Sequence, residues 1–544
     1  MSTPPGWLNF PSRLLCLASA LAAPATSQVT VRVSVDSLGA QGNDGSYYPS
    51  ISADGRYVAF WSYAPLVAGD TNGAPDIFVR DLQSGGTELV SVDSLGAQGN
   101  DGSYYPSISA DGRYVAFQSH ASNLVSGDTN SSTDIFVRDR QSSTTERVSL
   151  DSLETQANSF SDSASISADG RFVAFVSTAS NLVSGDTNQD FDVFVRDRQS
   201  GTTERASVDT LGAQGNEASY GPSISADGRF VVFVSSADNL VSGDTPGTFD
   251  TFLRDRQNGT TERVGLESFT ATISADGRYV AFESLNLAFG VFVHDRQSGT
   301  TELVSVDSLG VPANSACHTP SISADGRFVA FMSLADNLVG GDTDLHRDIF
   351  VRDRQSGTTE RVSVDSLGMQ GNADSSLPSL SSDGRVAFQS LASNLVSGDT
   401  NLDSDVFVHT RCDPATSTTF AGDGINADTI TPVNAVLGSS WSAPLTIGHA
   451  HGSGGPLVLK LRRSTVNGPN FISPVGGRLT EVLITGPLYG TFSGTHNGVT
   501  GDIAPQAIPN DLALVGLTWA AQYTVSGGGF ADLSQAVVGV VGCP

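Results

Sequence analysis

Short runs of apolar residues separated by polar turns follow one another along residues 29–410. One stretch shows the pattern in full: YYPSISA (104–110), YVAFQS (114–119), DIFVRD (134–139) and TERVSLD (145–151). The second and third runs are almost continuously apolar, which is typical of strands covered on both faces, whereas the fourth alternates as a strand with one face in water does. Asp-Gly between the first two runs is a tight hairpin signal. The pattern predicts a unit of four antiparallel strands.

This unit recurs seven times, and its marker is the aspartate of the DGR turn. The aspartate returns at intervals of 49 to 58 residues, at Asp54, Asp111, Asp169, Asp227, Asp276, Asp325 and Asp383. A period this long indicates an array of supersecondary units. Because four-stranded antiparallel units repeated in a ring form a β-propeller, we expect an all-β fold with a seven-bladed β-propeller over residues 28–411.

The last unit lacks its outer strand, because DVFVHT (405–410) continues directly into Arg411 and Cys412. A matching strand stands at the other end of the chain, where VTVRVSVDS (29–37) resembles the outer strand of the other units. We therefore predict that the N-terminal strand completes blade seven and leaves no open sheet edge.

The connections between strands differ in length on the two faces of the expected ring. The DGR and RQSGT turns are tight, whereas the second-to-third connection, for example 120–133, and the connection between blades are long. In a four-stranded meander these two kinds of connection lie on opposite faces. Long loops in a compact domain are usually functional, so we expect the long-looped face to bind a ligand.

The long loops carry the only candidate site chemistry, a recurrent G-D-T-N-x-x-x-D. Its oxygen side chains at relative positions 1, 3 and 7 are those that a calcium loop offers. The candidate ligands are Asp70, Asn72, Asp76, Asp128, Asn130, Asp134, Asp186, Asn188, Asp192, Asp342, Asp344, Asp348, Asp399, Asn401 and Asp405. Blade four keeps only Asp244 and Asp250, and blade five lacks the loop. The alternative is that these side chains make Asx turns and cap the following strand.

An Arg-Asp pair, such as Arg138 and Asp139, ends the third strand of most units. Since the pair repeats with the architecture, we interpret it as an ion pair or turn contact that joins blades. No catalytic residue is predicted.

The charge balance narrows the partners. With 29 basic against 57 acidic residues the formal net charge is −28, which disfavours nucleic acid. An apolar run at Leu14–Ala23 followed by APATSQ is typical of a secretory signal peptide over residues 1–27. No later apolar stretch is long enough for a transmembrane segment. We expect a secreted or periplasmic protein, or one at the cell surface.

Residues 412–544 shift to Gly, Pro, Thr and apolar β segments such as 456–463 and 512–525. This composition predicts a β-sandwich-like domain. Cys412 and Cys543 bracket it, and a disulfide between them would join its two ends in an oxidising compartment.

The phrases SxDGRxVAFxS and DIFVRDxxSG resemble the repeat of the TolB-type, WD-repeat-like propellers of exported bacterial proteins. The resemblance covers residues 29–410 and implies the propeller fold. The six blades and N-terminal α/β domain of TolB itself are not matched.

These observations predict a secreted, non-enzymatic scaffold that binds a protein or glycan through its acidic, long-looped face, with no required cofactor apart from the calcium considered above. One alternative is a carbohydrate-active hydrolase or lyase with acids near the propeller channel. The other is a structural surface or matrix component.

Overall fold

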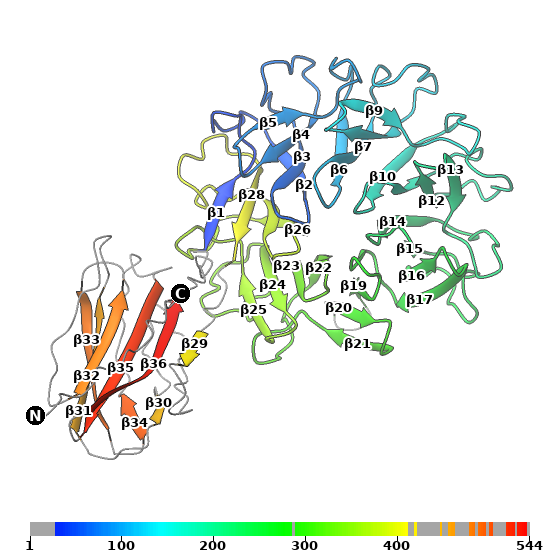
Figure 1. The fold of residues 1–544 in the computed structure, drawn as a ribbon. Coiled ribbons are helices and arrows are strands. Elements are labelled where there is room, and N and C mark those ends of the chain that lie inside the picture. The colour runs from blue at the N-terminus through cyan, green and yellow to red at the C-terminus, as the bar shows by residue number, and fades with distance from the viewer. Residues whose placement is uncertain are drawn as a thin grey trace, which may run out of the picture. The chain divides into compact units, whose positions relative to one another are not determined.

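The computed structural model describes residues 28–285 and 289–411 with their side chains, and beyond them the backbone of strands between residues 418 and 540. Residues Gln28–Arg411 form one compact unit. The described residues form strands and turns and no helix, so the all-β prediction is confirmed. None of these residues therefore belongs to a helix that could cross a membrane. Figure 1 shows the strands of the compact unit arranged as blades in a ring.

Six blades are four-stranded antiparallel meanders of consecutive strands. In chain order they comprise β2 (Ser46–Ile51), β3 (Tyr57–Ser62), β4 (Asp76–Asp81) and β5 (Thr87–Leu89); β6 (Ser103–Ile108), β7 (Tyr114–Ser119), β8 (Asp134–Asp139) and β9 (Thr144–Arg147); β10 (Ser161–Ile166), β11 (Phe172–Ser177), β12 (Asp192–Asp197) and β13 (Thr202–Arg205); β14 (Ser219–Ile224), β15 (Phe230–Ser235), β16 (Asp250–Asp255) and β17 (Thr260–Gly265); β18 (Ala271–Ile273), β19 (Tyr279–Ser284), β20 (Gly290–Asp295) and β21 (Thr300–Leu303); β22 (Cys317–Ile322), β23 (Phe328–Ser333), β24 (Asp348–Asp353) and β25 (Thr358–Arg361).

Blade 7 is built from both ends of the ring. It contains β26 (Ser375–Leu380), β27 (Val386–Ser390) and β28 (Asp405–Thr410), and its outer strand is β1 (Val29–Arg32). Strands β1 and β28 pair antiparallel, with Val29 opposite Thr410 and Arg32 opposite Phe407. The predicted seven-bladed ring, closed by the N-terminal strand, is thereby confirmed.

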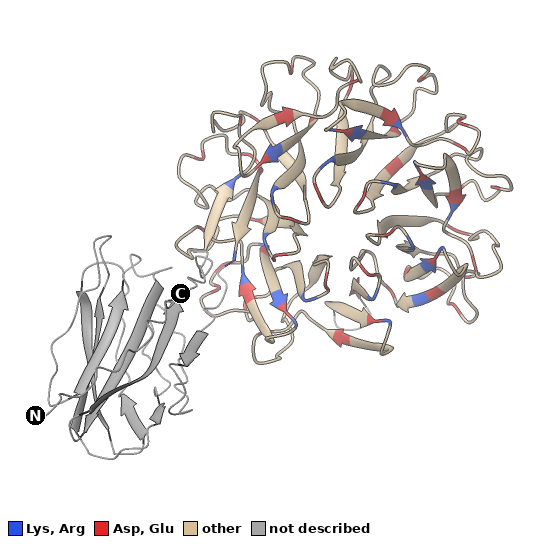
Figure 2. Cartoon of the chain, viewed as in Figure 1, with Lys and Arg blue, Asp and Glu red and all other residues tan. Residues whose placement is uncertain are grey.

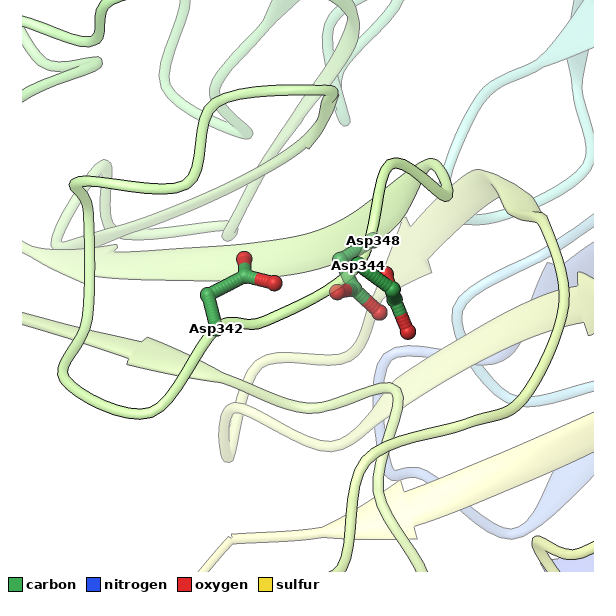
Figure 3. A group of neighbouring side chains, drawn as sticks. All are labelled: Asp342, Asp344 and Asp348. Carbon is green, nitrogen blue, oxygen red and sulfur yellow. The ribbon is translucent and has the colours of Figure 1, made fainter.

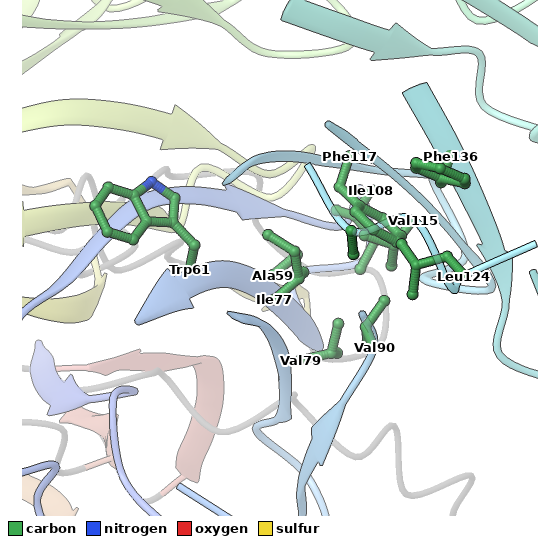
Figure 4. Packing of buried hydrophobic residues seen from close by; sticks show 11 residues of the cluster. Ala59, Trp61, Ile77, Val79, Val90, Ile108, Val115, Phe117, Leu124 and Phe136 are labelled. Carbon is green, nitrogen blue, oxygen red and sulfur yellow. The ribbon is translucent and has the colours of Figure 1, made fainter. Parts of the chain in front are cut away.

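The hydrophobic core lies between neighbouring blades. Phe117 and Phe136 of blade 2 are fully buried, with ring centroids 6.0 Å apart. They belong to one cluster with Ala59, Ile77 and Val79 of blade 1 (Figure 4). Since each sheet buries both faces against its neighbours, the middle strands must be apolar on both sides, which explains their continuous apolar runs.

The DGR hairpins of blades 1 to 6 are each held against the next blade by an aromatic ring. Tyr57 of blade 1 lies under the guanidinium groups of Arg56, at 4.7 Å, and of Arg140 from blade 2, at 4.4 Å. Arg140 also donates to the carbonyl of Gly112 and pairs with Glu88. Gly112 has φ +71°, and a Cβ there would overlap the Tyr57 ring. The ring, both arginines and the glycine therefore form one block between two blades.

Equivalent blocks join five further pairs of blades. Their rings, each with the arginine from the following blade, are Tyr114 with Arg198, Phe172 with Arg256, Phe230 with Arg296, Tyr279 with Arg354, and Phe328 with Arg411. The contact between blades 7 and 1 differs. There Arg385 donates to the carbonyl of Gly55 at 3.0 Å, and Leu82 stands in the position that Arg140 has in blade 2.

The recurrent Arg-Asp pair that ends the third strand joins blades, but its two members have different partners. Asp139 accepts two hydrogen bonds from Arg113 of the DGR turn, at 2.9 and 2.7 Å, and this contact holds the pKa of Asp139 well below its usual range. Arg138 donates to the carbonyl of Asp93, in the connection from the preceding blade, at 2.9 Å. The aspartate thus fastens a hairpin within its blade, and the arginine fastens neighbouring blades.

In the C-terminal region the described backbone forms eight strands in two four-stranded antiparallel sheets. They are β29 (Thr418–Ala421), β30 (Thr446–Gly448), β31 (Gly455–Arg462), β32 (Arg478–Ile484), β33 (Leu488–His496), β34 (Thr500–Ile503), β35 (Thr518–Gly527) and β36 (Phe530–Val540). Two antiparallel sheets are what a β-sandwich-like domain requires. The predicted signal peptide over 1–27 and the predicted disulfide between Cys412 and Cys543 lie outside the described residues.

The block between blades predicts a specific cost for one glycine. Gly112→Ala should lower the free energy of unfolding by about 3 kcal/mol, because Tyr57 must leave its site and the left-handed backbone disfavours a side chain. Gly127→Ala is the control: φ is +79° there but no atom lies within 4 Å, so about 1 kcal/mol is expected. Urea unfolding measures both. Equal losses of unfolding free energy in Gly112→Ala and Gly127→Ala would contradict the proposed packing of Gly112 on Tyr57.

A buried histidine makes the ring closure sensitive to acid. His409 of β28 bonds Thr30 of β1 (Nδ1 to Oγ1, 2.8 Å), and burial lowers its pKa to about 4. A histidine in the unfolded chain takes up its proton near pH 6.5, whereas folded His409 stays neutral until about pH 4. The free energy of unfolding is therefore highest above pH 6.5 and falls by about 3 kcal/mol as the pH is lowered towards 4. Unfolding at pH 7 and pH 4 should show a smaller pH difference for His409→Gln than for wild type. An equal pH difference in wild type and in His409→Gln would contradict the assignment.

Candidate functional site

The two long connections of each blade meet on one face of the ring. Gln98, from the connection between blades 1 and 2, donates to Asp70 at 2.7 Å and to Asp76 at 2.6 Å, and both aspartates belong to the second-to-third connection of blade 1. Because the second strand ends and the first strand begins on this side, the described loops agree with the expected long-looped face. Figure 2 shows that acidic positions recur around the whole ring.

Each complete GDTN loop is held by hydrogen bonds from its own middle residue. In blade 1, Asn72 Oδ1 accepts from the backbone N–H of Ala74 at 2.8 Å, which is an Asx turn. Asn72 Nδ2 donates to Asp76 at 2.9 Å and to the Gly99 carbonyl at 3.0 Å. The same turn forms at Asn130, Asn188, Asn401 and Asp344.

A glutamine bridges the first and last aspartates of every complete loop. The five bridges are Gln98 to Asp70 and Asp76, Gln156 to Asp128 and Asp134, Gln214 to Asp186 and Asp192, Gln370 to Asp342 and Asp348, and Gln41 to Asp399 and Asp405. These glutamines are not among the site residues predicted from the sequence. A signal for them exists, because the glutamine accompanies every complete loop, and Pro312 replaces it after blade 5, where the loop is absent.

An arginine joins the bridge in four of these loops. Arg147 lies 3.4 Å from Asp128 and 3.3 Å from Asp134, and Arg205, Arg361 and Arg32 have the same role in blades 3, 6 and 7. Blade 1 has Leu89 there instead. Burial raises the pKa of Asp76 to about 6, so this carboxylate depends on the hydrogen bonds from Gln98 and Ser91.

Blade 6 has the densest group of acids. Asp342, Asp344 and Asp348 each bring a carboxylate oxygen within 4.8 Å of the others, and Figure 3 shows them along one loop. Arg361 lies 3.2 Å from Asp342, and Gln370 donates to Asp342 at 2.8 Å. In blade 4 Arg263 bonds both Asp244 and Asp250.

The arrangement therefore brings together the first and last candidate ligands of each loop, with N–H donors between them. A cation must be contacted by lone pairs of the carboxylate oxygens, and the glutamine amide and the arginine already use these lone pairs as hydrogen-bond acceptors. Calcium binding at these loops stays a prediction, and the hydrogen-bonded loop is the alternative to it.

One acid and one histidine from neighbouring blades lie together on the same face. Glu283 Oε2 of blade 5 is 3.5 Å from His318 Nδ1 of blade 6 and accepts the backbone N–H of Thr319 at 3.1 Å. Gln118 and Gln389 occupy the position of Glu283 in blades 2 and 7, and accept the corresponding N–H of Ser163 and Tyr48. Since amides serve there equally, this contact is a join between blades.

A groove in blade 4 lies between the two kinds of long connection. Asp209, Thr210 and Leu211 line one side and residues 238–243 the other, around a volume of about 570 Å³. Leu211 is exposed at the tip of a turn fixed by Asp209, which accepts the N–H groups of Leu211 and Ala213. Exposed leucines recur at such tips: Leu38, Leu95, Leu153, Leu309 and Leu367.

The glutamine bridge gives a direct test of the loops. Gln156→Ala should lower the free energy of unfolding in calcium-free buffer by about 1 to 3 kcal/mol, because buried oxygens of Asp128 and Asp134 lose a donor. The control Gln83→Ala, on an exposed turn, should have little effect. Thermal unfolding in EDTA and then in millimolar calcium is the measurement, and we expect no rise of the melting temperature with calcium. A substantial rise of the melting temperature with calcium in both the Gln156→Ala and the Gln83→Ala variant would show that the loops bind calcium.

No protein-family model and no curated protein matches this chain. Solved structures do. TolB from Acinetobacter baumannii is similar at 18% identity, over 52% of this chain and 58% of that chain, with a TM-score of 0.33. This chain thus covers little more than half of that TolB.

Two further similar structures are the β-propeller domain of the Trilobed protease from Pyrococcus furiosus and Kuenenia stuttgartiensis hydrazine synthase. The first has 14% identity over 64% of this chain and 91% of that chain, with a TM-score of 0.42. The second has 14% identity over 68% and 96%, with a TM-score of 0.36. Likenesses this distant concern the fold alone, and the strand pairing described above makes the chain a β-propeller protein.

Proposed function

We propose that this chain is an exported, non-enzymatic scaffold of the TolB-type repeat family that holds a protein or glycan ligand on its long-looped face. The observation that carries the proposal is the contrast between the faces. Tight DGR and RQSGT turns close one of them, whereas the other presents long loops fixed by the glutamine bridges. Loops on a rigid scaffold are the usual place for binding residues.

The rigidity of these loops favours binding. A ligand that contacts pre-ordered loops meets no large ordering cost, so more of the contact energy appears as affinity. Residues 238–243, which line one side of the groove, belong to a long loop and provide further contact points. Export to the periplasm or cell surface belongs to the same proposal, on the evidence of the N-terminal sequence.

The contact between Glu283 and His318 favours the alternative of a carbohydrate-active enzyme, because it is an acid–histidine pair confined to two blades. Two observations weigh against it. Glycoside hydrolysis generally needs a second carboxylate opposite the first, and Glu283 occupies a position where other blades use glutamine. The alternative of a structural matrix component predicts self-association in place of a ligand.

Paired variants of the two faces test the proposal. The full chain is immobilised and titrated with the total extracellular protein, and separately with the total extracellular polysaccharide, of a culture of the source organism. We expect saturable binding that falls by about fivefold or more in Leu345→Arg with Ser242→Arg, two exposed positions on long loops. The control is Gln141→Arg with Gln199→Arg, on the tight turns of the other face, which should bind as wild type.

Three results would overturn the proposal: no saturable binding, equal losses in both variants, or a probe recovered chemically cleaved.

A further inference from the structure

Aromatic side chains gather at the ring-axis side of the long-looped face, a region called the inner rim below. In blades 1 and 2 they are Tyr47, Tyr48, Trp61, Tyr63, Tyr104 and Tyr105. All stand at the start of an innermost strand or at the end of a second strand. These are the strand ends that carry the long loops, so the rings belong to the proposed binding face.

A second group of aromatic side chains lies in blades 3 to 5. Phe160, Phe191, Tyr220, Phe249 and Phe269 follow one another with ring centroids 5.2 to 6.4 Å apart. Phe191 and Phe249 directly precede third strands, positions at which blade 1 has Pro75 and blade 2 Thr133. Tyr220 has the position of Tyr47 and Tyr104 in the repeat, whereas Phe191 and Phe249 use a different one, so copying of one unit does not explain all of these rings.

Two of the exposed tyrosines occupy a strained backbone position. Tyr48 and Tyr105 both have φ +51° in an innermost strand, and each is 37% exposed. Glycine suits this conformation best, and blade 4 has Gly221 there. The same position is left-handed at Ser163, Thr319 and Leu377, so the conformation belongs to the repeat, and the large aromatic side chain there is what distinguishes blades 1 and 2.

Trp61 packs against Tyr47 and lies next to the exposed Tyr48. Its indole stacks on Tyr47 at 4.6 Å and lies 6.4 Å from Tyr48. Figure 4 shows it apart from the aliphatic side chains of its cluster. The indole is nine-tenths buried, and its Nε1 donor has no hydrogen-bond partner among the described residues. A buried donor without a partner is rare in a finished core.

Carboxylates stand beside these rings. Asp403 accepts the hydroxyl of Tyr47 at 2.9 Å. Burial raises the pKa of Tyr48, with smaller contributions from Tyr105 and then Asp162, and burial followed by Asp190 raises the pKa of Tyr220. The phenols therefore stay protonated and act as donors at physiological pH. With carboxylates as their neighbours, the rings alternate with hydrogen-bond acceptors.

This chemistry matches a sugar better than the other candidates. A pyranose ring has an apolar C–H face that packs on an aromatic face, and hydroxyls that donate to carboxylates, so each ring-and-acid pair offers both contacts. Acidic polysaccharides would be repelled by the same carboxylates. A cation cage needs rings that face one point, whereas Tyr48 and Tyr105 meet edge to face at 85° and Trp61 is covered by Tyr47.

We infer that the inner rim of blades 1 to 5 binds a neutral oligosaccharide, with Tyr48 and Tyr105 as stacking platforms. The inference rests on the proposed function, since it names the ligand class of the long-looped face.

Native affinity electrophoresis of the full chain tests it, with gels that contain laminarin, hydroxyethylcellulose or arabinoxylan as neutral probes and alginate or heparin as anionic ones. We expect at least one neutral polysaccharide to retard the wild type. Tyr48→Gly with Tyr105→Gly should weaken that affinity about tenfold or more, because two platforms are lost. Glycine relaxes the backbone at both positions, so the variant should fold. Ser163→Gly is the matched control, at the same strained position in blade 3 (φ +55°), and should bind as wild type.

Retardation by no neutral polysaccharide, or by anionic ones only, overturns the inference, and so does unchanged affinity of the double variant. Saturable binding of poly-lysine that the double variant loses would assign the rim to cations and overturn it too. If the face variants lose a protein ligand while no neutral polysaccharide binds, this inference fails and the proposed function stands.

Discussion

The contact on which the ring depends is the aromatic side chain that follows each DGR turn, held between two arginines and pressed on a glycine of the next blade. Each of blades 1 to 6 supplies the ring to the following blade, and each of blades 2 to 7 supplies the glycine and an arginine to the preceding one, so a single phrase serves both sides of a repeated interface. A head-to-tail contact of this kind closes when the rotation per unit divides the circle. The recurrence of SISADGRYVAF therefore reflects the six blade-to-blade contacts that this phrase makes.

The junction of blades 7 and 1 shows what happens when this contact is absent. Blade 7 has Val386 directly after the DGR turn and so lacks the aromatic residue, and blade 1 has Leu82 in place of the arginine. Both members of the pair have changed together. The junction is held instead by the hydrogen bond from Arg385 to the Gly55 carbonyl and by the pairing of β1 with β28. Thr30 of β1 also donates its hydroxyl to the carbonyl of Val364, in the connection between blades 6 and 7. Backbone pairing has replaced side-chain stacking at the point of closure.

The blades, their order and the closing strand could be predicted from the sequence, because hairpin turns and apolar runs are local patterns. The partners of the candidate site could not, because Gln98 and Asp70 lie 28 residues apart in loops that no local pattern connects. Arg138 and Asp139 are adjacent in sequence, yet successive side chains of a strand point to opposite sides and so have different partners. The inner rim stayed hidden because the left-handed residues at Tyr48 and Tyr105 shift the alternation of an apparently regular strand.

The pairing of Thr30 with His409 spans 379 positions of the chain, so ring closure joins the two ends of the compact unit. During synthesis the first strand emerges long before its partner, so six blades can stack while the N-terminal segment stays unpaired. The outer edge of β28 then remains an open template, to which a strand of another copy could add. The yield of closed rings should therefore depend on keeping nascent copies apart until the last blade is made. This demand falls on the synthesis of the protein, not on its finished structure.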